Sequence, residues 1–125
     1  MAEAQQQLQA LSDEYQKLQQ DLQNSVNSRQ KLESQQQENK AVQKEFDGLE
    51  EDANIYKMVG PVLLKQDKTE AVMAVNSRLE FIENEIKRIE KQISDTESKS
   101  DAVRQQIIQI QSEGQLQAAQ PQIAA

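Results

Sequence analysis

Hydrophobic residues in the second half of the chain recur at alternating steps of three and four residues. Ten of the thirteen positions in this series carry Val, Leu or Ile. A repeat of 3.5 residues turns one apolar stripe toward a partner helix and gives a left-handed supercoil. The pattern therefore predicts a coiled-coil helix and excludes simple disorder. The series comprises Val72, Val75, Leu79, Ile82, Ile86, Ile89, Ile93, Thr96, Ser100, Val103, Ile107, Ile110 and Gly114.

The first half repeats this spacing less regularly. Its series begins with Leu8, Leu11, Tyr15, Leu18, Leu22, Ser25, Arg29 and Leu32. Polar Gln36 and Asn39 follow, and we expect Val42, Phe46, Leu49 and Ala53 to resume the stripe in a shifted frame. Such a shift alters the winding locally without ending the helix.

Two long helices joined by a short connection pack antiparallel. Pairing the stripes so that residue numbers sum to 125 sets Leu22 against Val103, Ser25 against Ser100, and Arg29 against Thr96. Polar layers that meet polar layers would fix the register, because a slip would bury them against Leu or Ile. The alternative is that these polar residues are only tolerated in a thin, solvated seam.

Residues 54–67 interrupt the repeat and read as a β-hairpin. Two short runs rich in β-branched, aromatic and aliphatic residues, 55–59 and 62–65, flank the turn signal Gly60-Pro61. Asp67 then suits the N-cap of the next helix, with Glu70 completing a capping-box pattern. The predicted fold is mainly α: a long antiparallel two-helix coiled coil with a single β-hairpin between the helices.

A two-stranded hairpin is marginally stable in water unless another surface covers it. It could fold back onto its own helices or pair with hairpins of other subunits. We favour pairing, because a slender coiled coil offers little surface to cover a sheet. The predicted assembly residues are Ile55, Tyr56, Met58, Val59, Gly60, Pro61, Val62, Leu63 and Leu64.

Composition fits a narrow seam better than a globular core. Hydrophobic residues make up 36% of the 125, where a globular domain has about 45–50%. The net charge of −7 disfavours nucleic acid as a partner. The sequence lacks an apolar run long enough to span a membrane and a secretory signal at its N-terminus, so we expect a cytoplasmic protein.

The residue types needed for most catalysis are missing. The chain has no His and no Cys, and its three glycines are too scattered for a phosphate-binding loop. The acidic cluster 50–52 lacks the alternating ligands and central glycine of a calcium loop. We therefore expect no enzymatic activity, no metal and no cofactor.

The segment 55–66, followed by a helix that begins near Glu70, closely resembles the signature of β-class prefoldin subunits. The resemblance covers roughly residues 5–113 and is most specific in the hairpin and the early second helix, including 78–82 and 85–88. It implies a hetero-hexameric, ATP-independent holding chaperone in which hairpins form β-barrels and coiled coils project from them. The implied partners are five other prefoldin subunits (two α-class and three β-class), unfolded actin and tubulin, and the cytosolic chaperonin.

Apolar residues near the free ends of both helices are the candidates for client binding. Leu8, Leu11, Tyr15, Ile107 and Ile110 belong to the stripe, and frayed ends would make them available. For each of them a purely structural role in the seam is the alternative. Ile108, Leu116 and Ile123 lie off the stripe and are also candidates for client binding. Met73 and Phe81, near the hairpin, lie off the stripe as well, and we expect these two to pack against the barrel or a neighbouring subunit.

The expected organisation has four parts: a helix over 1–53, the hairpin over 54–67, a second helix over 68–113 and a disordered, Gln-rich tail over 114–125. A structural tether built from a coiled coil is the competing function. The exposed apolar hairpin favours the chaperone subunit over the tether, because a tether has no need of such a hairpin.

Overall fold

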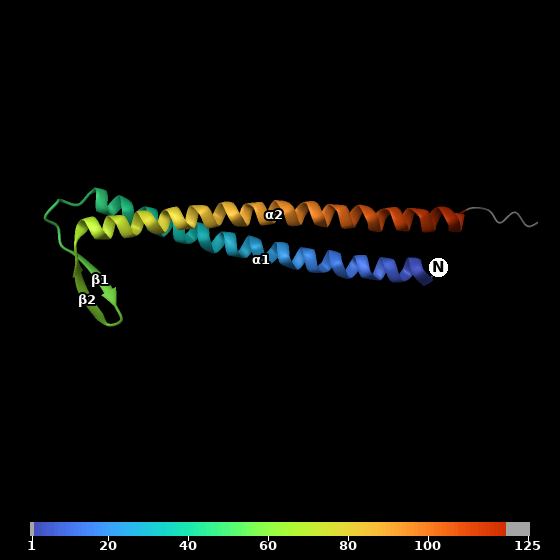
Figure 1. The fold of residues 1–125 in the computed structure, drawn as a ribbon, viewed down its shortest axis with the longest axis horizontal. Coiled ribbons are helices and arrows are strands. Elements are labelled where there is room, and N and C mark those ends of the chain that lie inside the picture. The colour runs from blue at the N-terminus through green and yellow to red at the C-terminus, as the bar shows by residue number, and fades with distance from the viewer. Residues whose placement is uncertain (1, 120–125) are drawn as a thin grey trace, which may run out of the picture. The chain divides into compact units, whose positions relative to one another are not determined.

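The computed structural model describes residues 2–119, and its element order is helix, two strands, helix. Helix α1 spans Ala2–Asp47, strand β1 spans Ile55–Val59, strand β2 spans Val62–Gln66, and helix α2 spans Lys68–Ala119 (Figure 1). Two long helices with one antiparallel hairpin between them confirm the predicted fold class.

Helix α1 ends six residues earlier than predicted. Residues 2–47 contain neither glycine nor proline and are rich in Gln, Glu, Lys, Leu and Ala, which favour helix. Gly48 closes the helix by donating its amide hydrogen bond to the Lys44 and Glu45 carbonyls, at 3.2 Å each. Residues 48–53, predicted as helix, instead form turns, and Lys68 Nζ donates to the Leu49 carbonyl at 3.0 Å.

The hairpin turns through Gly60 and Pro61, as predicted. Val59 pairs with Val62 across the turn, so two residues form the loop. Gly60 has φ +59°. A positive φ at the first loop position followed by a proline matches a type II′ turn, whose twist suits antiparallel strands.

Helix α2 begins where the sequence placed its cap and continues beyond the predicted end. Asp67 is the N-cap, because its carbonyl accepts the first helical bond from the Ala71 amide at 3.0 Å. The helix passes through Gly114 to Ala119, so residues 114–119 are helical rather than part of a tail. A single glycine costs a helix only about 1 kcal/mol. The remainder of the predicted tail, 120–125, lies outside the described residues.

The chain forms two compact units. The hairpin unit comprises residues 27–90, and the tip unit comprises the described parts of 1–26 and 91–125. In the hairpin unit, Ile55, Ala71, Val75, Ile82 and Ile89 are buried, and in the tip unit Ser100 and Val103 are buried. None of the described residues of α1 reaches the same burial, so α2 supplies the deepest part of each seam.

The α2 stripe is confirmed, whereas the predicted frame shift in α1 is wrong. The positions of α2 from Val72 to Ile110 in the predicted series are all buried or half-buried. In α1 the half-buried positions continue the original frame through Gln36, Asn39, Gln43 and Phe46. Val42 stays 40% exposed. Gln43 takes the seam position instead, and its amide donates to Asn76 Oδ1 at 2.8 Å.

The predicted register is also wrong. In the hairpin unit, Gln43 bonds Asn76, and Arg29 Nη2 lies 3.2 Å from Glu90 Oε1. In the tip unit, Gln19 Nε2 donates to Ser100 Oγ at 2.6 Å. The residue numbers of each pair sum to 119 rather than 125, a displacement of six residues or about 9 Å along a helix. Ser100 therefore meets Gln19 instead of Ser25, and Arg29 meets Glu90 instead of Thr96.

The described part of the chain has no helix that is both long and apolar enough to cross a membrane. Within the same residues, no group of His, Cys, Asp or Glu has an arrangement that could hold a metal ion.

Candidate assembly interface and tip surface

The hairpin presents apolar side chains on both of its faces. Because side chains alternate along a strand, the pairing of Ile55 with Gln66 and of Val59 with Val62 defines the two faces. One face carries Ile55, Lys57, Val59, Val62, Leu64 and Gln66. The other face carries Tyr56, Met58, Leu63 and Lys65.

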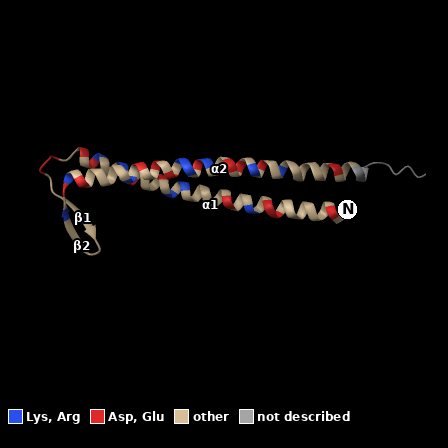
Figure 2. Ribbon diagram, in the orientation of Figure 1, with Lys and Arg blue, Asp and Glu red and all other residues tan. Residues whose placement is uncertain are grey.

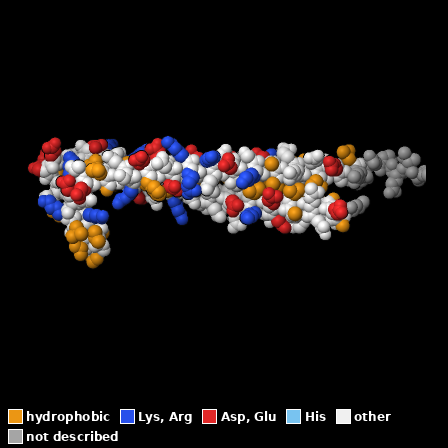
Figure 3. Space-filling view, viewed as in Figure 1, with side chains coloured by type: hydrophobic (Ala, Val, Ile, Leu, Met, Phe, Trp, Pro, Cys, Tyr) orange, Lys and Arg blue, Asp and Glu red, His pale blue; other side chains and the backbone are white. Residues whose placement is uncertain are grey.

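Most of these side chains have no cover within the chain. Ile55 is buried, but Tyr56 is 55% exposed, Met58 73% and Leu63 59% on one face, and Val59, Val62 and Leu64 are about half exposed on the other. Figure 3 shows hydrophobic side chains gathered over the hairpin. The hairpin therefore does not fold back onto its own helices, the first of the two predicted alternatives.

Two lysines limit where another strand or sheet can pack. Lys57 is paired with Leu64, and Lys65 is paired with Tyr56, so each face carries one ammonium group. The ribbon of both strands carries no red for Asp or Glu (Figure 2). Lysine at a sheet edge discourages indiscriminate pairing. The arrangement favours a partner that leaves both ammonium groups in water while covering the apolar residues near the turn.

In the tip unit, five of the six predicted client-binding residues lie in the seam. Leu8, Leu11, Tyr15, Ile107 and Ile110 are half-buried. Ile108 is 47% exposed and Leu116 is 66% exposed, so both are accessible without any opening of the helices. Ile123 lies outside the described residues.

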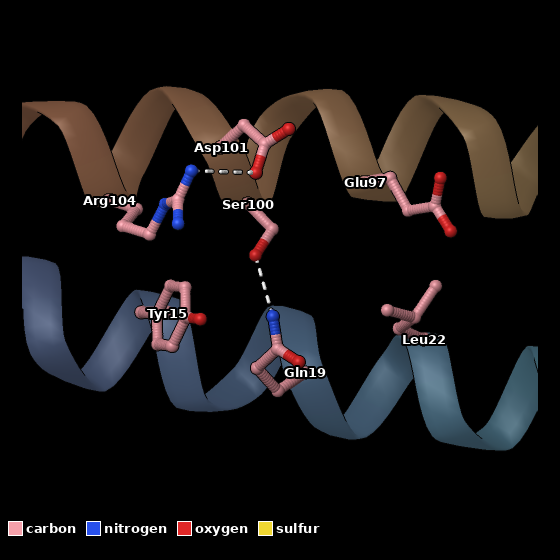
Figure 4. Close-up of a pocket in the computed structure, with 7 residues that line it drawn as sticks. All are labelled: Tyr15, Gln19, Leu22, Glu97, Ser100, Asp101 and Arg104. Carbon is pink, nitrogen blue, oxygen red and sulfur yellow. Dashed lines mark hydrogen bonds and ion pairs between the residues drawn. The ribbon is translucent and has the colours of Figure 1, made fainter.

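A groove of about 240 Å³ opens beside the polar layer of the tip unit (Figure 4). Tyr15 and Leu22 supply its apolar walls, and the hydrogen bond from Gln19 to Ser100 crosses its floor. Its rim carries charge, with Arg104 Nη2 3.7 Å from Asp101 Oδ1. Binding sites for small molecules are typically 300–1,000 Å³, so this groove has room for about one side chain.

The sequence pattern missed the exposure of Val42. An unbroken count of three and four residues from Leu32 through Gln36 and Asn39 leads to Gln43, which leaves Val42 outside the seam. At this position hydrophobicity favours Val42 for the seam, whereas the spacing favours Gln43. The spacing alone would have found it.

Comparisons with known proteins agree with this architecture. The prefoldin subunit family matches residues 4–114. The crystal structure of the prefoldin beta subunit from Thermococcus strain KS-1 superposes with a TM-score of 0.75 at 31% identity, over 81% of this chain and 89% of that one. The chain belongs to the prefoldin family and is a chaperone subunit of the β type.

Relatives named prefoldin subunit 6 extend the match over most of the sequence. The protein from Saccharomyces cerevisiae is 48% identical over 100 residues, which cover 80% of this chain and 88% of the relative. The Homo sapiens protein is 44% identical over 111 residues, covering 89% and 86%. The chain is thus similar to subunit 6 across both helices and the hairpin. The family comprises non-enzymatic chaperones.

Proposed function

We propose that this chain is the subunit-6-type member of a hetero-hexameric, ATP-independent holding chaperone in the cytoplasm. It joins two α-class and three other β-class prefoldin subunits through its hairpin. The tips of the complex capture unfolded proteins such as actin and tubulin, and the complex passes them to the cytosolic chaperonin.

The uncovered hairpin is the observation that carries the assembly part of the proposal. Its two apolar faces and two free edges are unstable as an isolated pair of strands. Pairing with hairpins of other subunits covers the faces and satisfies the backbone groups at the edges together. The hairpin is an independent reason to favour a barrel-forming subunit over a simple tether.

Substitution of the hairpin tests assembly. Met58→Lys with Leu63→Lys should prevent recovery of a complex on the tagged full-length chain, because one hairpin face becomes cationic. Both residues are exposed, so helix content by circular dichroism should stay unchanged. The matched control is Ser77→Lys, also exposed but on helix α2. A full-mass complex from the double variant, measured by native mass spectrometry, would contradict the assembly role.

Capture of clients is proposed for the tip unit. Exposed Ile108 and Leu116 give an extended chain immediate apolar contact, and the groove beside Tyr15 receives one of its side chains. Ile108→Asp with Leu116→Asp in the assembled complex should reduce capture of denatured actin several-fold without changing the complex mass. Ser112→Asp, exposed on the same part of α2, is the control. Unchanged capture, also after deletion of 1–11 and 108–125, would refute the tip assignment.

A further inference from the structure

Three large apolar side chains of the hairpin unit are exposed outside both the seam and the hairpin: Val42, Met73 and Phe81. Val42 is 40% exposed, while the next residue, polar Gln43, takes the seam position. Phe81 is 64% exposed, although the chain has only two Phe and two Tyr. An exposed large aromatic residue forgoes the burial of some 150–250 Å². Its position therefore requires an explanation.

Helical geometry places Val42 and Phe81 on the same flank of the helix pair. Each directly precedes a seam residue, Gln43 in α1 and Ile82 in α2. In an antiparallel pair, these preceding positions of the two helices lie along one side, because the helices run in opposite directions. Asn76, which accepts a hydrogen bond from Gln43, directly follows the seam residue Val75 and therefore lies on the opposite side. Val42 and Phe81 thus lie on the same side of the helix pair, about four residues apart along it in the observed register.

Charged residues of α2 surround this apolar pair. Arg78 lies three residues before Phe81, and in the observed register it is within one residue of the level of Val42. Glu85 lies four residues after Phe81, and Arg88 donates to it with Nη2 2.8 Å from Glu85 Oε2. This hydrogen bond holds the pKa of the Glu85 carboxyl below its usual value. Apolar residues at the centre with a charged rim are the ordinary anatomy of a protein interface.

We propose that this surface, the Phe81 flank (Val42, Ala74, Arg78, Phe81, Glu85 and Arg88), packs against a helix of a neighbouring prefoldin subunit. The proposal rests on the assembly role of the hairpin. It adds a second contact, made by the helices, to the contact made by the strands. Phe81 is its apolar anchor, and Arg78 and Glu85 select the partner by charge.

The partner is a sister subunit because the flank and the hairpin belong to the same compact unit. A neighbour that pairs with the hairpin has its own helices joined to its strands, so they are brought near this flank. Alternating charges beside an apolar centre also match a regular helix, whose side chains repeat at fixed spacing. An unfolded client presents no such fixed spacing, which makes it the weaker occupant.

Photo-cross-linking tests the contact directly. Phe81 is replaced by p-benzoylphenylalanine in the full-length tagged chain, which keeps an aromatic ring at the position, and the assembled complex is irradiated. The same probe at Tyr56 reports the hairpin contact, and at Ser77 it reports a neighbouring exposed position. We expect cross-links to a sister subunit from positions 56 and 81, at least several-fold stronger from 81 than from 77.

The outcomes separate the two proposals. Cross-links from position 56 without any from 81 overturn the Phe81 flank and leave the hairpin role intact. Failure at both positions, with no complex recovered, overturns the assembly role itself. Cross-links from 81 to added denatured actin instead of a sister subunit assign the flank to clients and refute the proposal.

A substitution measures the strength of the contact. Phe81→Asp should make the subunit dissociate from the complex about tenfold faster or more, as expected for an aromatic anchor. Phe81→Tyr should keep wild-type dissociation, and Ser77→Asp, at an exposed position of the same helix outside the flank, should leave it unchanged. Equal dissociation of Phe81→Asp and the wild type would contradict the proposal.

Discussion

At the scale of single residues, two glycines of the same chain have opposite energetic roles. Gly60 has φ +59° at the hairpin turn, and a Cβ there would meet no atom within 4 Å. Any penalty for a side chain at Gly60 therefore comes from the backbone conformation alone. Gly114 lies inside α2 with equally open space, so its cost to the helix is conformational freedom.

Alanine substitution at each glycine should consequently have opposite effects. Gly60→Ala should destabilise the hairpin by about 1–2 kcal/mol, because L residues disfavour the left-handed region. Gly114→Ala should stabilise the helix by up to about 1 kcal/mol. Urea dissociation of the assembled complex reports the first effect, and thermal melting of the helices by circular dichroism reports the second. A Gly60→Ala complex as stable as the wild type would exclude the turn geometry described here.

At the scale of elements, polar side chains help to set the alignment of the helices. Gln19 with Ser100 in the tip unit, and Gln43 with Asn76 in the hairpin unit, are hydrogen-bonded across the pair. A slip of the helices would separate these groups and leave a buried serine without its partner, at about 1–3 kcal/mol. The ion pair from Arg29 to Glu90 is about half exposed and adds less.

Thiol cross-linking tests this alignment, since the natural chain contains no cysteine. Gln19→Cys with Ser100→Cys should be bridged readily by a short bifunctional thiol reagent. Ser25→Cys with Ser100→Cys should react several-fold more slowly, because its partners are displaced by about 9 Å. Both variants share the buried Cys at position 100, so its accessibility cancels. Faster reaction of the second pair would instead support the register in which the numbers of paired residues sum to 125.

The sequence was sufficient for the elements but not for their alignment. The 3.5-residue spacing located the α2 stripe, and Gly60-Pro61 located the turn, because both signals are local. The register depends on side chains that meet across the pair. Matching polar layers predicts Ser25 opposite Ser100, whereas in the structure the longer side chain of Gln19 reaches Ser100. The end of α1 was missed because Leu49 and Ala53 continue an apolar spacing beyond Gly48. Phe81, by contrast, lies off the stripe as the spacing predicts.

At the scale of the whole molecule, the chain by itself leaves apolar surface uncovered. Both faces of the hairpin are apolar, whereas the rest of the described surface is largely polar and the net charge is −7. General charge repulsion keeps such a chain dispersed, but the exposed hairpin opposes it locally. Whether charge repulsion or hairpin association dominates depends on the concentrations of protein and salt.

The isolated chain should accordingly self-associate as its concentration or the salt concentration rises. Sedimentation velocity on the purified full-length protein should show a shift to larger species, since salt screens the repulsion between exposed charges. Met58→Lys with Leu63→Lys should remain monomeric over the same range. Self-association of this variant equal to that of the wild type would place the responsible surface elsewhere in the chain.

The unequal burial of the two helices bears on how the sequence can change over evolutionary time. Helix α2 supplies buried Val75, Ile82, Ile89 and Val103, while none of the described positions of α1 is buried to that degree. A substitution in the seam of α2 removes well-packed atoms, whereas one in α1 removes half-solvated ones and costs less. We therefore expect substitutions to accumulate faster in α1, and sequence similarity between relatives to persist mainly in the hairpin and α2.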